Sequence, residues 1–92
     1  MKQIIHGKMY NTATAKFVCE CDFRSDGQWC CSKGLYKTLK GAYFFAIQGN
    51  ASNIWAPDNH IEVSSEKEAK VFCEEHGSPD DYISEWGEPE DA

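Results

Sequence analysis

Residues 35–47, L-Y-K-T-L-K-G-A-Y-F-F-A-I, decide the fold of this 92-residue chain. Apolar and aromatic residues lie on both sides of Leu39-Lys40-Gly41. A three-residue connection that ends in glycine is typical of a β-hairpin with a glycine bulge. The second run, residues 42–47, is the most apolar in the chain, and we predict that it is the central strand of an antiparallel sheet.

Two more strand signals precede this hairpin. Residues 3–5 and 8–10 flank His6-Gly7, a two-residue loop that predicts another tight hairpin. Asn11 and Thr12 offer caps for a short helical turn over residues 13–16, and Arg24–Gly27 is a predicted turn. Between these segments, apolar residues alternate with more polar ones, which predicts a strand with one buried face. That face would hold Phe17, Cys19, Cys21 and Phe23.

The apolar period changes from two to about 3.6 after a last predicted strand at residues 60–63. Ser65 and Glu68 have the spacing of a capping box, and Gly77 is expected to end that helix in the C′ position. The buried stripe would hold Ala69, Phe72, Cys73 and His76. Residues 78–86 predict a second helix, with Ser78 as its cap and Gly87 at its end.

These signals predict an α+β fold in a single domain over residues 1–87, followed by an acidic tail over residues 88–92. We expect a meander of four to five antiparallel strands with two short C-terminal helices packed on one face. The N-terminus runs straight into a strand pattern, and no apolar stretch reaches the roughly 20 residues of a membrane span. We therefore expect a cytoplasmic protein without a membrane partner, as a monomer or a weak homodimer.

The net charge of -6 is unevenly distributed along the chain. Residues 1–41 hold seven Lys/Arg and three Asp/Glu, whereas residues 42–92 hold two Lys and twelve Asp/Glu. Because residues 42–92 are so acidic, we expect this half of the chain to repel nucleic acid and to attract basic protein surfaces. Carboxylates outside the helix stripes can imitate a phosphate backbone, although a solvated face kept for solubility is the plainer alternative. The predicted partner-binding residues are Glu66, Glu74, Glu75, Asp80, Asp81, Glu85 and Glu88.

Direct nucleic-acid binding is the opposite hypothesis, because the first half interleaves basic residues with aromatic ones. These residues are Lys2, Lys8, Lys16, Arg24, Lys33, Lys37 and Lys40, with Tyr10, Trp29 and Tyr36 among them. The lysines are spread over several predicted strands and the whole chain is acidic. We therefore expect them to be the polar sides of amphipathic strands, with no direct contact to nucleic acid.

The sequence gives little support to a metal site or a catalytic site. Cys19, Cys21, Cys30 and Cys31 form C-x-C and C-C pairs, not the knuckles of structural zinc sites. Core thiols are the preferred interpretation, and a reducing cytoplasm disfavours disulfides. No motif places a thiol beside any of the three histidines, His6, His60 and His76. We expect no enzyme activity, no cofactor and no metal.

Several segments resemble a family of small proteins from phages and bacterial mobile elements, which share a pattern of the type I-I-N-G-K-x-Y-D-T-x-T-A. The similar segments are residues 2–15 (K-Q-I-I-H-G-K-M-Y-N-T-A-T-A), 35–45, 65–69 and 82–87. Some members look like anti-CRISPR proteins, so the resemblance implies an inhibitor that binds a CRISPR effector in a bacterial host cell. His6, where asparagine is usual, and the five cysteines depart from the pattern.

Two functions follow from these observations. The first is an anti-CRISPR-like inhibitor that blocks nucleic-acid binding by an effector complex through its acidic, DNA-mimicking face. The second is a non-catalytic accessory or regulatory module of a phage or mobile element, which would bind its protein partner through exposed apolar surface around Trp29 or Trp55.

Overall fold

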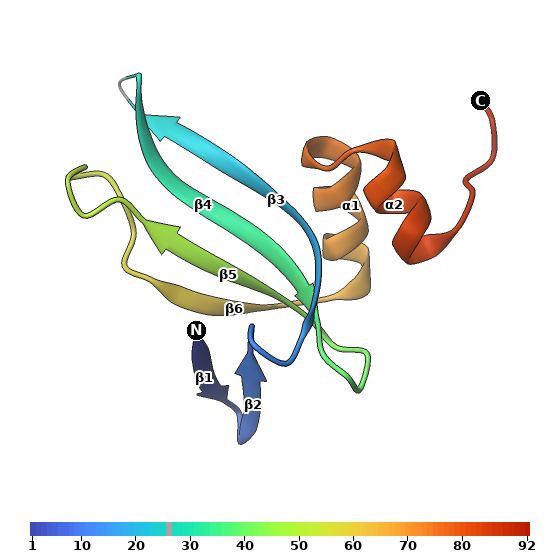
Figure 1. Ribbon diagram of the computed structural model, residues 1–92, viewed down its shortest axis with the longest axis horizontal. Helices are drawn as coiled ribbons and strands as arrows, with labels where there is room; N and C mark the ends of the chain where they lie inside the picture. The colour runs from blue at the N-terminus through green and yellow to red at the C-terminus, as the bar shows by residue number, and fades with distance from the viewer. Residues whose placement is uncertain (26) are drawn as a thin grey trace.

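Two antiparallel sheets and two C-terminal helices build the described part of the protein (Figure 1). The computed structural model describes residues 1–25 and 27–92. A two-stranded sheet pairs β1 (Lys2–Ile5) with β2 (Lys8–Asn11). A four-stranded meander follows, in the order β3 (Lys16–Ser25), β4 (Gln28–Lys37), β5 (Tyr43–Gly49) and β6 (His60–Ser64). The helices are α1 (Glu66–His76) and α2 (Pro79–Trp86). The predicted α+β fold is confirmed.

The first hairpin is a separate ribbon instead of part of the meander. Its turn residues, His6 and Gly7, have φ angles of 51° and 75°. Both values lie in the left-handed region that a two-residue type I′ turn requires. The Gln3 side-chain oxygen accepts a hydrogen bond from the Ile61 amide at 3.0 Å, so the hairpin covers part of the outer edge of β6.

The hairpin of residues 35–47 forms as predicted, although its first strand is longer than expected. β4 begins at Gln28, and β5 pairs with both β4 and β6, which makes it an inner strand. The connection covers residues 38–42, where Gly41 has a φ of 91° and the Thr38 hydroxyl accepts from the Ala42 amide at 3.0 Å. In the turn predicted between β3 and β4, Asp26 lies outside the described residues.

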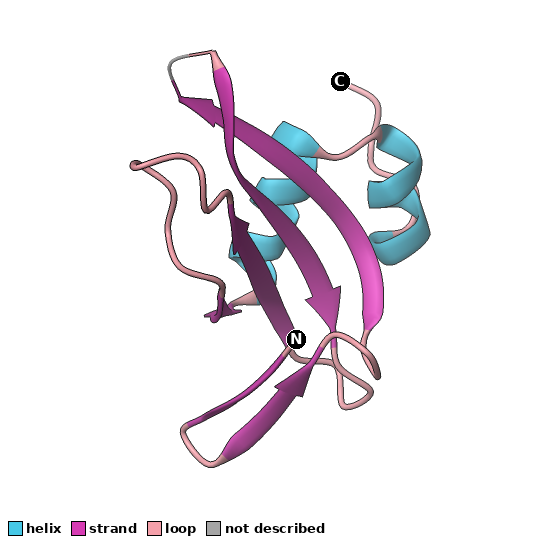
Figure 2. Ribbon diagram, turned by 60° about the vertical axis from the view of Figure 1, so that its left-hand side comes forward, coloured by secondary structure: helices cyan, strands magenta, loops and turns pink. Residues whose placement is uncertain are grey.

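The main core lies between the four-stranded sheet and the helices, which cover one side of the sheet (Figure 2). Sheet residues Val18, Cys19, Leu35, Tyr43, Phe45 and Ile47 meet helix residues Ala69, Phe72 and Cys73 there. A smaller cluster joins the first hairpin to the sheet through Tyr10, Phe44 and Ile61. One modest core therefore holds the helices in place.

The predicted burial of Phe17 is wrong. The pairing of β3 with β4 shifts register between Phe17 and Cys19, as a β-bulge does. Val18 therefore enters the core, and Phe17 is 50% exposed beside Tyr36. The predicted cap at Asn11 forms, because its side-chain oxygen accepts from the Ala13 amide at 2.9 Å and its carbonyl accepts from the Ala15 amide at 3.1 Å. The single turn closed in this way is shorter than predicted, since β3 already begins at Lys16.

Both helices start at the predicted serine caps. The Ser65 hydroxyl accepts from the Glu68 amide at 3.1 Å, and Ser78 forms a complete capping box with Asp81. α1 ends at Gly77 as predicted, but Gly77 is extended (φ -86°, ψ 175°) and not in the left-handed conformation usual at a C′ position. Glycine is needed here because an added Cβ would lie 2.8 Å from the Cys73 sulfur.

Candidate protein-interaction site

Acidic side chains gather where α1 ends and α2 begins. Glu74 and Glu75 lie in the last turn of α1, Asp80 lies in the first turn of α2, and all three are exposed. Glu88 is exposed just after α2, whereas Asp81 is half-buried. We call these five residues the acidic junction. The helices are held by the core, so these carboxylates are presented on a fixed frame.

Helix electrostatics distinguishes two groups within the acidic junction. Asp80 and Asp81 stand at the positive N-terminal end of α2, where carboxylates stabilise a helix, and Asp81 also accepts from the Ser78 amide at 3.1 Å. Glu74 and Glu75 stand at the negative C-terminal end of α1, where each destabilises the helix by about 0.3–1 kcal/mol. The Glu75 carboxylate lies 3.7 Å from Nε2 of His76 in the same turn. The helix dipole does not account for the position of either glutamate.

Glu66, another predicted partner-binding residue, is exposed in the first turn of α1. It lies eight residues before Glu74, which separates the two by about 12 Å along the helix axis at 1.5 Å per residue. The structure therefore places Glu66 at the opposite end of α1 from the acidic junction.

Glu85 is not part of the exposed acidic surface, which corrects the sequence-based prediction. Its side chain is only 2% exposed and bonds to Lys16 and Lys37 at 2.9 Å each. The Tyr43 hydroxyl donates to the same carboxylate at 2.6 Å. Burial alone would raise the pKa of Glu85, but the hydrogen bonds from Tyr43 and the two lysines outweigh it and lower the pKa to about 2. Glu85 therefore anchors α2 to the sheet.

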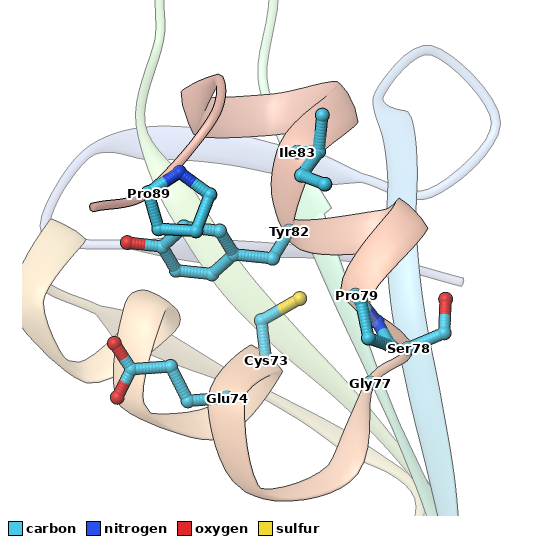
Figure 3. A pocket seen from close by; sticks show the side chains of 8 residues that line it. All are labelled: Cys73, Glu74, Gly77, Ser78, Pro79, Tyr82, Ile83 and Pro89. Carbon is cyan, nitrogen blue, oxygen red and sulfur yellow. The ribbon is translucent and has the colours of Figure 1, made fainter. Parts of the chain in front are cut away.

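A pocket of about 260 Å³ opens within the acidic junction (Figure 3). The end of α1, the start of α2 and Pro89 from the tail form its walls. The Tyr82 ring faces Pro89, and Cys73 belongs to the lining although it is almost fully buried. Glu74 is the one carboxylate of its lining. The two helices and their caps could be predicted from the sequence but this pocket could not, because its walls combine residues of both helices with Pro89 of the tail.

The cysteines do not assemble into a ligand set. Cys19 and Cys73 are buried together in the main core, Cys30 is buried in β4, and Cys21 and Cys31 are half-buried. No group of three or more metal-ligating side chains within residues 1–25 and 27–92 is arranged to hold an ion. Burial raises the pKa of Cys19 to about 12 and also raises the pKa of Cys31 and of Cys73. Thiols of this kind are poor nucleophiles at neutral pH.

The histidines have separate surroundings. His6 is exposed in the first turn. His76 is exposed at the end of α1, so its predicted place in the buried stripe is wrong. Its ring packs against the Phe72 ring with 5.1 Å between ring centroids, and its Nε2 atom lies 3.7 Å from the Glu75 carboxylate. His60 lies within hydrogen-bond distance of the Asp58 carbonyl (2.6 Å) and of the Glu62 carboxylate (2.8 Å). These two acceptors raise the pKa of His60. Both ring nitrogens of His60 therefore have partners within its own loop and strand.

At least four of the seven basic residues in the first half are engaged within the protein. The Arg24 guanidinium donates to the Gly27 carbonyl at 3.1 Å. Lys16 and Lys37 bond to Glu85, and the Lys33 ammonium lies 4.2 Å from the centre of the Phe45 ring. Their charges are therefore partly offset before any partner approaches. This arrangement weakens the hypothesis of a basic, nucleic-acid-binding face.

An apolar protrusion stands apart from the acidic junction, on the loop between β5 and β6. Ile54 is 88% exposed and Trp55 is 66% exposed. Asparagine side chains brace the loop: Asn53 accepts from the Trp55 amide at 2.9 Å, and Asn50 donates to the Trp29 carbonyl at 2.8 Å. The loop therefore holds two large apolar side chains in solvent on an ordered backbone.

Comparisons of the chain with protein-family models, with curated proteins and with solved structures give no match. Across the described part of the chain, none of the helices combines the length and apolar character needed to cross a membrane.

Proposed function

We propose that this protein is a non-catalytic inhibitor that acts in the cytoplasm of a bacterial host. It binds a protein partner with a basic nucleic-acid-binding surface and competes with nucleic acid for that surface. The observation that carries the proposal is the exposed pair Glu74 and Glu75 at the C-terminal end of α1, where they lower helix stability. A basic partner is the explanation that we propose for carboxylates at such a position.

The partner that the sequence resemblance implies is a subunit of a CRISPR effector complex. Such complexes hold nucleic acid in positively charged channels that contact its backbone. A set of carboxylates on a rigid helix pair offers such a channel negative charge without the flexibility of a disordered acidic tail. The acidic junction is therefore the surface that we assign to the effector.

Charge reversal tests this proposal. Glu74→Lys, Glu75→Lys and Asp80→Lys, combined, should reduce binding to a purified effector complex at least tenfold at low salt, because each change replaces attraction by repulsion. Asp81 is left intact because it caps α2. The matched control reverses Glu20 and Asp22, which are exposed on β3. Equal binding by the wild type and the triple variant would disprove the proposed role of the acidic junction.

The exposed loop supports a second candidate, an accessory or regulatory module that binds another phage or mobile-element protein. Ile54 and Trp55 are a preorganised apolar anchor of the kind that dominates many interfaces. In that case Trp55→Ala would abolish binding to the partner at any salt concentration, while charge reversal at the acidic junction would leave binding intact. The two variants therefore separate the two functions.

A further inference from the structure

The pocket of the acidic junction has the size of a site for one side chain. Its volume is about 260 Å³, below the roughly 300–1,000 Å³ of pockets that hold drug-sized ligands. Its walls come from two helices and from the tail, at the place where the partner is proposed to dock. The pocket is therefore suited to a residue that a partner inserts into the interface.

The lining combines apolar walls with one carboxylate. Pro79, Tyr82, Ile83 and Pro89 supply apolar surface and an aromatic ring, and Glu74 supplies the charge (Figure 3). The Tyr82 ring is itself held against Trp86, with 5.2 Å between the ring centroids. A fixed aromatic ring beside a carboxylate matches a side chain that is flat, cationic and carried on an apolar stem.

The charges around the pocket select the same class of side chain. Its lining residues include no lysine or arginine. Two further acidic residues are next to the lining in sequence: Asp80 directly follows Pro79, and Glu88 directly precedes Pro89. An anionic side chain would be repelled, and a neutral apolar one would gain nothing from Glu74. A guanidinium can stack on an aromatic face and bond to a carboxylate through two parallel N–H groups, whereas an ammonium group offers only a compact charge.

We propose that this pocket binds one arginine side chain of the protein partner. The guanidinium lies between the Tyr82 ring and the Glu74 carboxylate, and the aliphatic stem lies against Pro79 and Ile83. This inference rests on the proposed function, since it names the residue type by which a basic partner engages the acidic junction. It also gives Glu74 a separate role from Glu75, which is absent from the pocket lining.

The test is an NMR titration of the full chain, labelled with nitrogen-15, with the peptide acetyl-Gly-Arg-Gly-amide. We expect saturable shifts of the Gly77, Tyr82 and Ile83 amides with a Kd on the order of millimolar, as suits a single-residue contact. The citrulline peptide, which has the same shape without the charge, and the lysine peptide should each bind at least threefold more weakly.

Two isosteric variants make the test specific to the pocket. Glu74→Gln should weaken binding of the arginine peptide by roughly threefold or more, as the loss of one exposed ion pair allows. Glu75→Gln removes the adjacent charge and should change the affinity less than twofold. The proposal is wrong if the citrulline or lysine peptide binds as tightly, if both variants weaken binding equally, or if no saturable shift occurs at these three amides.

The outcome is independent of the charge-reversal experiment. If the arginine peptide fails to bind but effector binding still depends on the acidic junction, the pocket is not an arginine site and the proposed function stands. If the arginine peptide binds as expected but charge reversal does not change effector binding, the arginine site stands and the proposed function is disproved.

Discussion

Replacing Glu85 with glutamine should destabilise the protein without touching its exposed acidic surface. The Glu85 carboxylate is buried and receives hydrogen bonds from Lys16 and Lys37, both at 2.9 Å, and from the Tyr43 hydroxyl at 2.6 Å. These contacts join α2 to three strands of the sheet. Glutamine keeps the shape and one acceptor oxygen but removes the charge that the two lysines share.

The size of the effect follows from the pKa of Glu85. A decrease from the ordinary value of 4.5 to about 2 corresponds to roughly 3 kcal/mol, at about 1.36 kcal/mol per pKa unit. The side chains of Lys16 and Lys37 are 57% and 36% exposed, so water takes up part of their charge when the carboxylate is lost. We therefore expect Glu85→Gln to lower the free energy of unfolding by about 2 kcal/mol at pH 7.

The effect has a defined pH dependence. The folded-state pKa of Glu85 lies below its unfolded-state value, so its stabilisation is complete above about pH 4.5 and is lost as the pH falls through about 2. Urea unfolding, followed by tryptophan fluorescence, should show the full difference between the wild type and Glu85→Gln at pH 7. At pH 3 the difference should be less than half as large.

Glu88→Gln is the matched control, because Glu88 is exposed just beyond the same helix. It should change the free energy of unfolding by less than about 0.5 kcal/mol. Two results would refute the assignment of Glu85 as a buried charged anchor. The first is a loss of less than about 0.5 kcal/mol in the free energy of unfolding for Glu85→Gln at pH 7. The second is a loss that is equally large at pH 7 and at pH 3.

Three further results are expected from variants and reagents. Glu74→Gln should raise the thermal midpoint by roughly 2–6 °C, because it removes about 0.3–1 kcal/mol of repulsion at the end of α1; a lower midpoint in calorimetry would contradict this. In urea unfolding, Gly77→Ala should lower the free energy of unfolding by more than about 2 kcal/mol, because the added Cβ would meet the Cys73 sulfur. Gly87→Ala should lower it by only about 1 kcal/mol, because Gly87 lies in open space and only its φ of 84° opposes alanine. Cys19 should resist thiol reagents at pH 8 until urea unfolds the chain, since its pKa is about 12, and rapid labelling of the native Cys19, located by mass spectrometry, would contradict its burial.

Much of the fold could be predicted because local signals and the packing agree. The serine caps determine where α1 begins, and Ala69, Phe72 and Cys73 determine which side it buries. The first half of β4 was missed because Trp29, Cys30 and Cys31 follow one another without alternation. The face of Phe17 was missed because a bulge of one residue inverts every side chain before it, and no residue type marks that bulge.

The candidate site could be predicted only in part. Exposed carboxylates at positions 74, 75 and 80 follow from the helix period, because they lie off the apolar stripes, and Glu88 follows the glycine that ends α2. Glu85 follows the same period, yet it is buried because lysines and a tyrosine from distant strands converge on it. The pocket beside Tyr82 depends in the same way on the path of the tail. Contacts between segments far apart in the sequence therefore determine both the burial of Glu85 and the formation of the pocket.

The most direct test of the central claim is a competition between this protein and target DNA for a purified CRISPR effector complex, at about 50 mM and about 500 mM salt. We expect the wild type to displace target DNA at low salt and this displacement to weaken steeply at high salt. The triple charge-reversal variant should fail to displace DNA at both concentrations. Displacement that is insensitive to salt and unaffected by charge reversal, or binding of the protein and target DNA to the effector at the same time, would contradict the central claim.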